Sequence, residues 1–301
     1  MKGFFMKRNI KSLWLFPFVS FLFILGISVL RALSVCTAYD AFIGYFESGS
    51  VVVLATSLLS AAYVILSLAV SIAVHYGEIP AIEDSGFSKS AAVALGVVIL
   101  FFSINHTNIS APLDSMGICT YLSVVCLLLG LPLCLFAWVK AKNAKAWLSF
   151  GALAISLSFV LHALRHYLST ELPINGDLKI LYMFTSLSAA LFFLSEAKRM
   201  LIKANNDTSH RFFTLCCGMF CFSVGASECF AHLYHKEAVS EHISHALLLI
   251  FVGVYALSRT IPSFSLEEDM ITHEPIPSPT LLPEIEEGDE ETKVENSQEN
   301  G

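Results

Sequence analysis

Long stretches without a formal charge alternate with short charged segments along this chain, and that pattern predicts its fold. Eight windows contain no Asp, Glu, Lys or Arg. Each supplies most or all of a membrane-spanning helix, which needs roughly 20 largely apolar residues. Helices are the expected occupants, because irregular backbone in lipid would leave amide groups without hydrogen bonds. The windows are 12–30, 48–77, 90–113, 115–139, 146–164, 180–195, 212–227 and 242–258.

The third and eighth windows leave an alternative open. Their strongly apolar runs, residues 91–104 and 246–257, are shorter than the others. Apolar runs of this length also occur in re-entrant or interfacial segments. We expect both to span, and an interfacial segment is the alternative for each.

Composition supports a protein that lies mostly in lipid. Of the 301 residues, 55% are hydrophobic and 14% charged, and the mean hydropathy is +0.67. These values exclude a pair of ordinary soluble domains, which the length alone would favour. We therefore predict an all-α fold, a polytopic transmembrane helical bundle of about eight helices over residues 12–261, with a basic cytoplasmic N-terminus at residues 1–11.

The net charge of -7 comes from the C-terminal end of the chain. Residues 262–301 hold twelve of the 25 acidic residues, one of the 18 basic residues and five of the ten prolines. Such a composition buries too little apolar surface to offset chain entropy, so we predict a disordered acidic tail. The tail either binds a basic partner or serves only as a solvated end.

The positions of Lys and Arg predict the orientation. With the N-terminus inside, thirteen basic residues near the span ends fall on the inner face and four on the outer face. Basic residues are retained on the cytoplasmic side, so this bias places both termini in the cytoplasm. The four outer residues are Arg31, Arg165, Lys179 and Lys236.

Two short similarities suggest an internal duplication. The sequence at 30–33 recurs at 161–164, about 130 residues later, and 56–62 resembles 185–190 at nearly the same offset. Two parallel four-helix repeats would explain both matches. Chance similarity between apolar segments is the alternative.

The segment after the first window carries a resemblance. Arg31 is followed by Tyr39, Asp40, Gly44, Tyr45 and, before the second predicted helix, Gly49. This hairpin, about sixty residues with its helices, resembles multispan membrane proteins of Clostridia-type bacteria. The resemblance implies a bacterial cytoplasmic membrane, and it carries no activity over to this chain.

The candidate chemistry lies near the outer ends of three predicted spans. Ionisable residues in or near membrane helices are costly and therefore the best pointers to function. Helical spacing puts Glu228, His232 and His235 on one face of the seventh helix. The full candidate set is His162, His166, Glu228, His232, His235, His242 and His245.

Three interpretations of this candidate set remain open. Imidazole groups at one depth suit a transition metal or haem, or a group that responds to pH. A carboxylate next to an apolar run also needs a partner, so Glu228 is expected to pair with Arg31 or Arg165. The alternative is that all these side chains reach interfacial water and have no special role.

No catalytic motif of the common kinds is present, and no basic stripe suggests nucleic acid, so the sequence favours a non-enzymatic role. We expect a sensory, accessory or scaffold protein whose partner is the lipid bilayer. The alternative is a small-solute or ion secondary transporter, which would need polar groups at mid-membrane on several helices. The middles of the second, fourth and eighth windows are almost wholly apolar. The sequence does not predict an oligomeric state.

Overall fold

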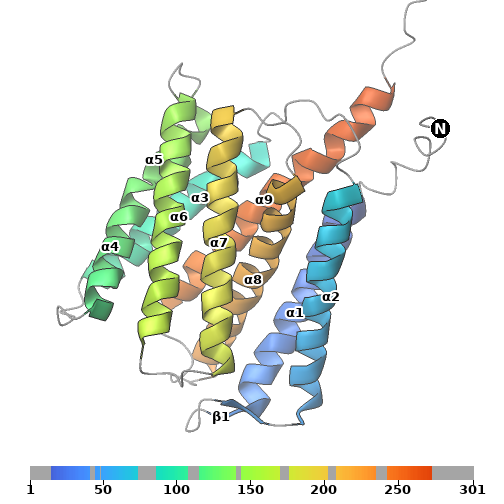
Figure 1. The fold of residues 1–301 in the computed structure, drawn as a ribbon, viewed down its shortest axis with the longest axis vertical. Helices are drawn as coiled ribbons and strands as arrows, with labels where there is room; N and C mark the ends of the chain where they lie inside the picture. Colours follow the sequence, from blue (N-terminus) through green and yellow to red (C-terminus); the bar gives the residue numbers. More distant parts are fainter. Residues whose placement is uncertain are drawn as a thin grey trace, which may run out of the picture.

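The chain folds into a bundle of long helices, shown as a computed structural model in Figure 1. The structure describes residues 15–40, 45–47, 49–73, 86–107, 115–139, 144–169, 176–202, 208–234 and 243–272, and it describes side chains only between residues 18 and 260. The predicted N-terminal segment, residues 1–11, and the part of the tail beyond residue 272 lie outside these ranges.

Within these ranges eight helices are long and apolar enough to cross a membrane, which confirms the predicted bundle. The first helix and the last four extend beyond their charge-free windows, because charged residues at a span end reach the interface and can continue the helix. The helices are α1 (Leu15–Ala38), α2 (Val51–Ala73), α3 (Gly86–Thr107), α4 (Ser115–Leu129) with α5 (Leu131–Leu135) and η3 (Phe136–Trp138), α6 (Ala144–Leu168), α7 (Asp177–Ile202), α8 (Thr208–Leu233) and α9 (Ile243–Thr272).

The third and eighth windows form full-length helices. α3 has 22 residues, and the apolar part of α9 covers Ile243–Thr260. Both lengths fall within the range of roughly 17–25 residues that membrane-spanning helices have. α9 continues to Thr272, past the predicted end of the transmembrane domain at residue 261.

The fourth span is one crossing made of three short helices. Gly130 ends α4, and the N–H of Leu133 donates to the Gly130 carbonyl at 3.0 Å as α5 begins. Pro132 has no N–H to continue the ladder, so the break falls where Gly130 and Pro132 predict a kink. A Cβ on Gly130 would lie 2.2 Å from Cγ1 of Ile155, so the absence of a side chain at Gly130 lets α6 approach closely.

The helices differ in how much of each is covered by the others. α6 packs along α7, α8 packs along α9, α3 lies against α9, and α1 and α2 lie together beside α8 (Figure 1). The spanning windows of α8 and α9 are 67% buried and that of α2 is 22% buried. α8 and α9 therefore form the centre, and α2 presents most of its surface to lipid. The two parallel repeats remain a prediction.

A two-residue β-ribbon joins α1 to α2. Tyr39 in β1 (Tyr39–Asp40) pairs with Phe46 in β2 (Tyr45–Phe46), and their rings meet at 5.3 Å. Burial and the neighbouring Asp40 raise the pKa of Tyr39 above its usual value, so the phenol is protonated at neutral pH. Gly49 follows with φ +90°, a backbone conformation that favours glycine.

Candidate functional site

Near one end of the long helices, five buried ionisable side chains meet. α6 and α8 end close to the level at which α9 begins, so the last turns of the first two face the first turn of the third (Figure 1). All five side chains are at most 6% exposed. We call this group the histidine cluster: His106 of α3, His162 and His166 of α6, Glu228 of α8 and His245 of α9.

His245 is the centre of the histidine cluster. Its Nδ1 lies 3.1 Å from Oε2 of Glu228, and both side chains are 2% exposed. Its ring stacks against His162, with centroids 5.7 Å apart and planes inclined by 17°. The ring of His166 lies 6.1 Å away at a steeper angle. α9 is thus joined to both α6 and α8 through one imidazole.

Two serines hold His162. Nδ1 of His162 lies 2.5 Å from Oγ of Ser123 on α4, and that hydroxyl lies 2.8 Å from Oγ of Ser158. Ser123 and Ser158 are at most 1% exposed. A buried hydroxyl between an imidazole and another hydroxyl can donate to one and accept from the other, so it tolerates either tautomer of His162.

Aromatic rings enclose the remaining members. His166 stacks on Tyr182 of α7 at 5.1 Å, and His106 stacks on Phe102 at 3.9 Å. Phe102 also lies 5.8 Å from His162 and 6.3 Å from His245. The histidine cluster is therefore packed from side chains of α3, α6, α7, α8 and α9.

The structure brings together four of the seven side chains predicted as a site: His162, His166, Glu228 and His245. His232 is exposed in the last turn of α8, where Leu233 is 70% exposed. His232 lies one turn after the buried Glu228, and this last turn of α8 is exposed. His235 and His242 lie outside the described residues.

The partner of Glu228 differs from the expected one. Its salt bridge is to His245, and no ion pair joins it to Arg31 or Arg165 in the described ranges. Arg31 on α1 interacts electrostatically with Tyr182, and Arg165 is partly exposed on α6. An imidazole fills the role that a guanidinium was expected to have, because His245 in the first turn of α9 reaches the carboxylate of Glu228.

The described side chains show no ready-made metal centre. No three His, Cys, Asp or Glu residues among them are grouped closely enough to hold a metal ion. The Nδ1 atoms of His162 and His245 face Ser123 and Glu228, and the rings stack on one another. Two of the seven predicted ligands are not described, so the metal or haem site remains a prediction.

A second buried polar group lies at the opposite end of the bundle. We call it the glutamate cluster: Glu196 and Arg199 of α7, His210 of α8, and Tyr255 and Arg259 of α9. Glu196 is fully buried. Arg259 donates to its Oε1, Arg199 donates to both carboxylate oxygens at 3.1 and 3.2 Å, and Nε2 of His210 lies 3.3 Å from Oε2.

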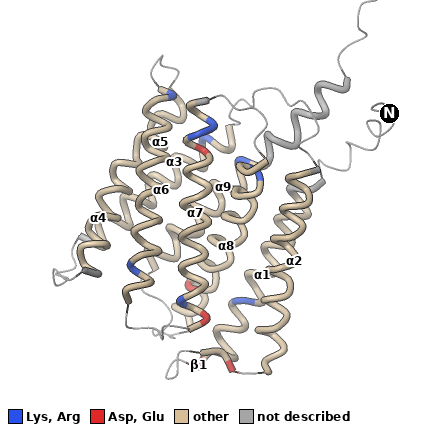
Figure 2. Tube along the Cα trace, in the orientation of Figure 1, with Lys and Arg blue, Asp and Glu red and all other residues tan. Residues whose placement is uncertain are grey.

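The two clusters are well separated. His245 and Arg259 are fourteen residues apart on α9, about 21 Å at the helical rise per residue. Figure 2 shows the charged positions gathered toward the two ends of the bundle, with uncharged helix between them. The space between holds stacked aromatic rings, among them Phe159 and Phe193 at 6.1 Å.

Sequence reasoning missed His106 and the whole glutamate cluster. His106 falls inside a charge-free window one turn after Phe102, and its depth matches that of His162, which is the signal that could have found it. Glu196 directly follows a charge-free window and therefore resembles an interfacial residue. Its i,i+3 spacing to Arg199 was a signal for an ion pair but not for burial.

Comparison with known proteins gives no relatives. No protein-family model matches the chain, and neither the curated proteins nor the solved structures give a match. The class therefore rests on the fold: eight long apolar helices packed as a bundle define a multi-pass integral membrane protein. Within that class, two buried polar clusters distinguish this chain.

Proposed function

We propose that this chain is a non-enzymatic membrane protein of the sensory type, and that its histidine cluster responds to pH by taking up a proton. The observation that supports the proposal is the Glu228–His245 pair, in which both side chains are 2% exposed. The rings of His162 and His166 lie against the same imidazole. Histidine is the side chain whose ordinary titration falls near neutral pH.

The packed cluster accommodates little positive charge. Glu228 and a protonated His245 form a neutral pair. A second proton, on His162, would place two positive charges at the 5.7 Å ring separation, and their mutual repulsion alone is about 3 kcal/mol at an effective dielectric constant of about 20. The packed form therefore binds fewer protons than an opened form, and acid favours opening.

Opening would act on several helices together. His162 and His166 belong to α6, Glu228 to α8 and His245 to α9, so separating the imidazoles moves α6 away from α9. A switch requires a charge change at a packed element with two arrangements. The proposed output of the sensor is this movement at one end of the bundle.

The test compares hydrogen exchange at two pH values in the full chain reconstituted in lipid nanodiscs. Below about pH 6, backbone exchange in α6 and α9 near the histidine cluster should be roughly tenfold faster than at pH 7.5, after correction for intrinsic rates. The variant His162→Gln with His166→Gln keeps the Glu228–His245 pair and should lose the response. His232→Gln, an exposed histidine at the same end, is the matched control and should keep it.

Two results would overturn the proposal. One is an acid response that persists in the double variant. The other is stoichiometric metal or haem in the purified chain that the double variant lacks, because the cluster would then be the metal site that the sequence suggested.

The alternative function is a small-solute or ion transporter. A transporter needs a polar path between the two ends. The aromatic packing of Phe159, Phe193 and Tyr255 between the clusters favours the sensor instead. Proton-coupled uptake by the reconstituted chain would establish the transporter.

The setting we propose is a bacterial cytoplasmic membrane, with both termini in the cytoplasm. The resemblance of the first hairpin and the bias of Lys and Arg toward one end support it. The acidic tail, residues 262–301, is then on the cytoplasmic side, where a basic partner can bind it.

A further inference from the structure

The exposed face of α6 is an apolar stripe with an aromatic side chain at each end. Trp147 lies in the first turn of α6 and Tyr167 in its last turn, and both are exposed. Every largely exposed position between them is apolar, and Arg165 is only partly exposed. These positions lie three or four residues apart, as one face of a helix requires. They are Phe150, Leu153, Leu157, Val160 and Leu164. The twenty residues from Trp147 to Tyr167 rise by about 30 Å.

The exposed face of α7 carries a matching stripe that ends in charged side chains. Asp177 and Lys198 are exposed near the two ends of the helix. The largely exposed positions between them are again five apolar residues, spaced three or four apart. They are Ile180, Phe184, Leu187, Leu191 and Leu194. α6 and α7 pack side by side (Figure 1), so the two stripes belong to one surface of the bundle.

Two hydrogen bonds between α6 and α7 fix the level of one helix relative to the other. Oγ of Ser156 donates to the carbonyl of Ala190 at 2.8 Å. Oγ of Ser149, two turns earlier on α6, donates to the carbonyl of Ala197, two turns later on α7, at 3.2 Å. The two helices are therefore antiparallel and keep one register over these turns.

The same register brings the ends of the two stripes level. Counting two residues outward from Ser149 and Ala197 places Trp147 within one residue of Lys198. Counting toward the other end places Tyr167 within two residues of Asp177. Two neighbouring helices thus change from apolar to polar or aromatic surface at the same two levels, although their sequences run in opposite directions.

The fourth span adds a second tryptophan near the level of Trp147. The ring of Trp147 stacks on that of Phe136 in η3 at 6.4 Å, and Trp138 ends the same short helix. Trp138 is exposed, and Nζ of Lys89 lies 5.6 Å from its ring centre. Tryptophan and lysine side chains of three helices therefore gather at one end of the apolar surface.

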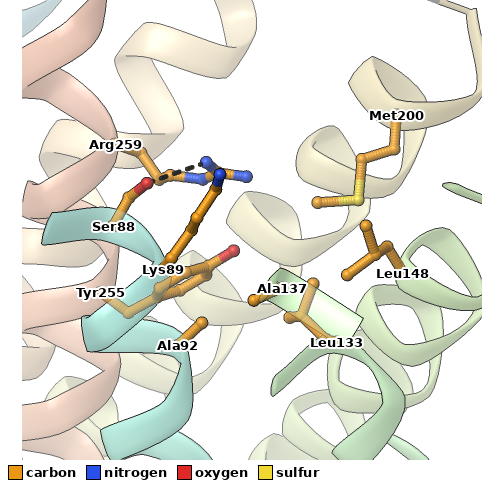
Figure 3. A pocket seen from close by; sticks show the side chains of 9 residues that line it. All are labelled: Ser88, Lys89, Ala92, Leu133, Ala137, Leu148, Met200, Tyr255 and Arg259. Carbon is orange, nitrogen blue, oxygen red and sulfur yellow. Dashed lines mark hydrogen bonds between the residues drawn. The ribbon is translucent and has the colours of Figure 1, made fainter. Parts of the chain in front are cut away.

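Each buried cluster lies at one of these two levels. Figure 3 shows a small hollow whose walls include Lys89 of α3, Leu148 of α6 and Arg259 of α9. Leu148 directly follows Trp147, so the glutamate cluster, to which Arg259 belongs, is level with the tryptophans. At the other end His166 directly precedes Tyr167, so the histidine cluster is level with the tyrosine.

We propose that this surface binds both headgroup layers of a phospholipid bilayer whose hydrocarbon core is about 30 Å thick. Trp138 and Trp147 lie in the headgroup layer at the end with the glutamate cluster, and Tyr167 lies in the opposite layer. Tryptophan and tyrosine gather at this depth because each has an apolar ring and a polar N–H or O–H group. The two apolar stripes contact the acyl chains between the layers.

A second copy of the chain is the competing occupant of this surface. An interface between two copies needs apolar side chains, but it gives no reason for both stripes to end at levels separated by the thickness of a bilayer. The proposal does not depend on the sensor function. It places His166 at the level of the headgroups, where water is available as a source of protons.

The experiment measures tryptophan depth in the reconstituted full chain by quenching with brominated phosphatidylcholines. Three variants with a single tryptophan are compared. The first keeps Trp147 and carries Trp14→Phe and Trp138→Phe, and the other two add Trp147→Phe with either Leu157→Trp or Tyr167→Trp. Leu157 is the matched control, because it lies on the same face midway along the stripe.

Bromines next to the headgroup should quench Trp147 and the Tyr167→Trp variant more strongly than bromines near the ends of the acyl chains. The Leu157→Trp variant should show the reverse preference, roughly twofold, since ten residues of helix place it about 15 Å from either end. Equal depth at the three positions would contradict the proposed placement. Absence of quenching in the Leu157→Trp variant by either lipid would show that protein, such as a second copy, covers the stripe.

A second measurement uses the unmodified chain and does not depend on the folding of any variant. Thermal unfolding is followed in nanodiscs of phosphatidylcholines with increasing acyl-chain length. The unfolding midpoint should be highest where the hydrocarbon core is about 30 Å thick, because a thinner or thicker bilayer adds the cost of hydrophobic mismatch. A midpoint that rises steadily with chain length, or does not change, would rule out the proposed thickness.

Discussion

The two buried carboxylates of the bundle have partners of different chemistry, and this difference assigns them different roles. Glu196 contacts His210 and is also held by two arginines, Arg259 and Arg199, whose guanidinium groups stay charged at any physiological pH. Glu228 is held by the imidazole of His245, which titrates. The ion pairs of Glu196 with the two arginines therefore connect α7 to α9 whatever the pH, whereas protons can alter the Glu228–His245 pair.

Replacing Glu196 by Gln should destabilise the fold strongly. The change keeps the volume but leaves two cations, Arg199 and Arg259, around a neutral amide in a fully buried position. Removing one partner of a buried ion pair costs roughly 3–5 kcal/mol. We expect thermal unfolding in detergent to occur many degrees lower than in the wild type.

The matched control for Glu196→Gln is Asp177→Asn, which removes an exposed carboxylate from the first turn of the same helix. Only its interaction with the helix dipole is lost, less than about 1 kcal/mol. Similar stability losses in the two variants would show that the glutamate cluster is not a structural tie.

At the scale of elements, close helix contacts depend on glycine. α5 lies against α6 where Gly151 faces the break after α4, and a Cβ there would lie 2.6 Å from the backbone nitrogen of Leu133. Backbone cannot move aside as a flexible side chain can. The position of α5 therefore depends on the absence of a side chain at Gly151.

Gly151→Ala should therefore lower stability by about 1–3 kcal/mol, the usual cost of overpacking. Gly26→Ala on α1 is the control, because a Cβ there meets nothing within 4 Å. Alanine also favours the helix, so this control should be neutral or slightly stabilising. Unfolding of both variants in one detergent measures the difference, and equal stabilities would contradict the packing argument.

The sequence predicted the helices well because lipid imposes a simple rule. A window without charge must be helical and must be about as long as the bilayer is thick, so the number of spans followed directly. Which faces meet does not follow from that rule. His232 shares a face with Glu228 and is nevertheless exposed, while His106 on α3 joins the histidine cluster because α3 packs on α9.

For the glutamate cluster, the sequence does not predict how deeply Glu196 is buried. Glu196 comes directly after an apolar window, where most acidic residues reach water. Its burial depends on α9 placing Arg259 against α7 and on His210 of α8 closing the third side. Contacts among three helices depend on how the bundle packs, and no periodic pattern in the sequence of a single helix predicts them.

At the scale of the whole molecule, the basic side chains are distributed unequally between the two ends of the bundle. The end with the glutamate cluster carries most of the basic side chains that the structure describes, and the end with the histidine cluster carries fewer (Figure 2). The first set is Lys89, Lys145, Lys198, Arg199, Arg211 and Arg259, and the second is Arg31, Arg165 and Lys179. By the positive-inside rule, this bias supports the proposal that the first end faces the cytoplasm.

This sidedness makes a prediction that bears on the proposed sensor. If the glutamate cluster faces the cytoplasm, the histidine cluster lies at the outer face and samples external pH. In intact bacterial cells, a membrane-impermeant maleimide should label Tyr234→Cys at once and Lys145→Cys only after permeabilisation. Labelling of the parent chain measures the background from the native cysteines. Both positions are exposed at the helix ends, so access depends on the side of the membrane alone. The reverse pattern would place the histidine cluster in the cytoplasm, where pH is buffered, and would remove the physiological basis for the sensor.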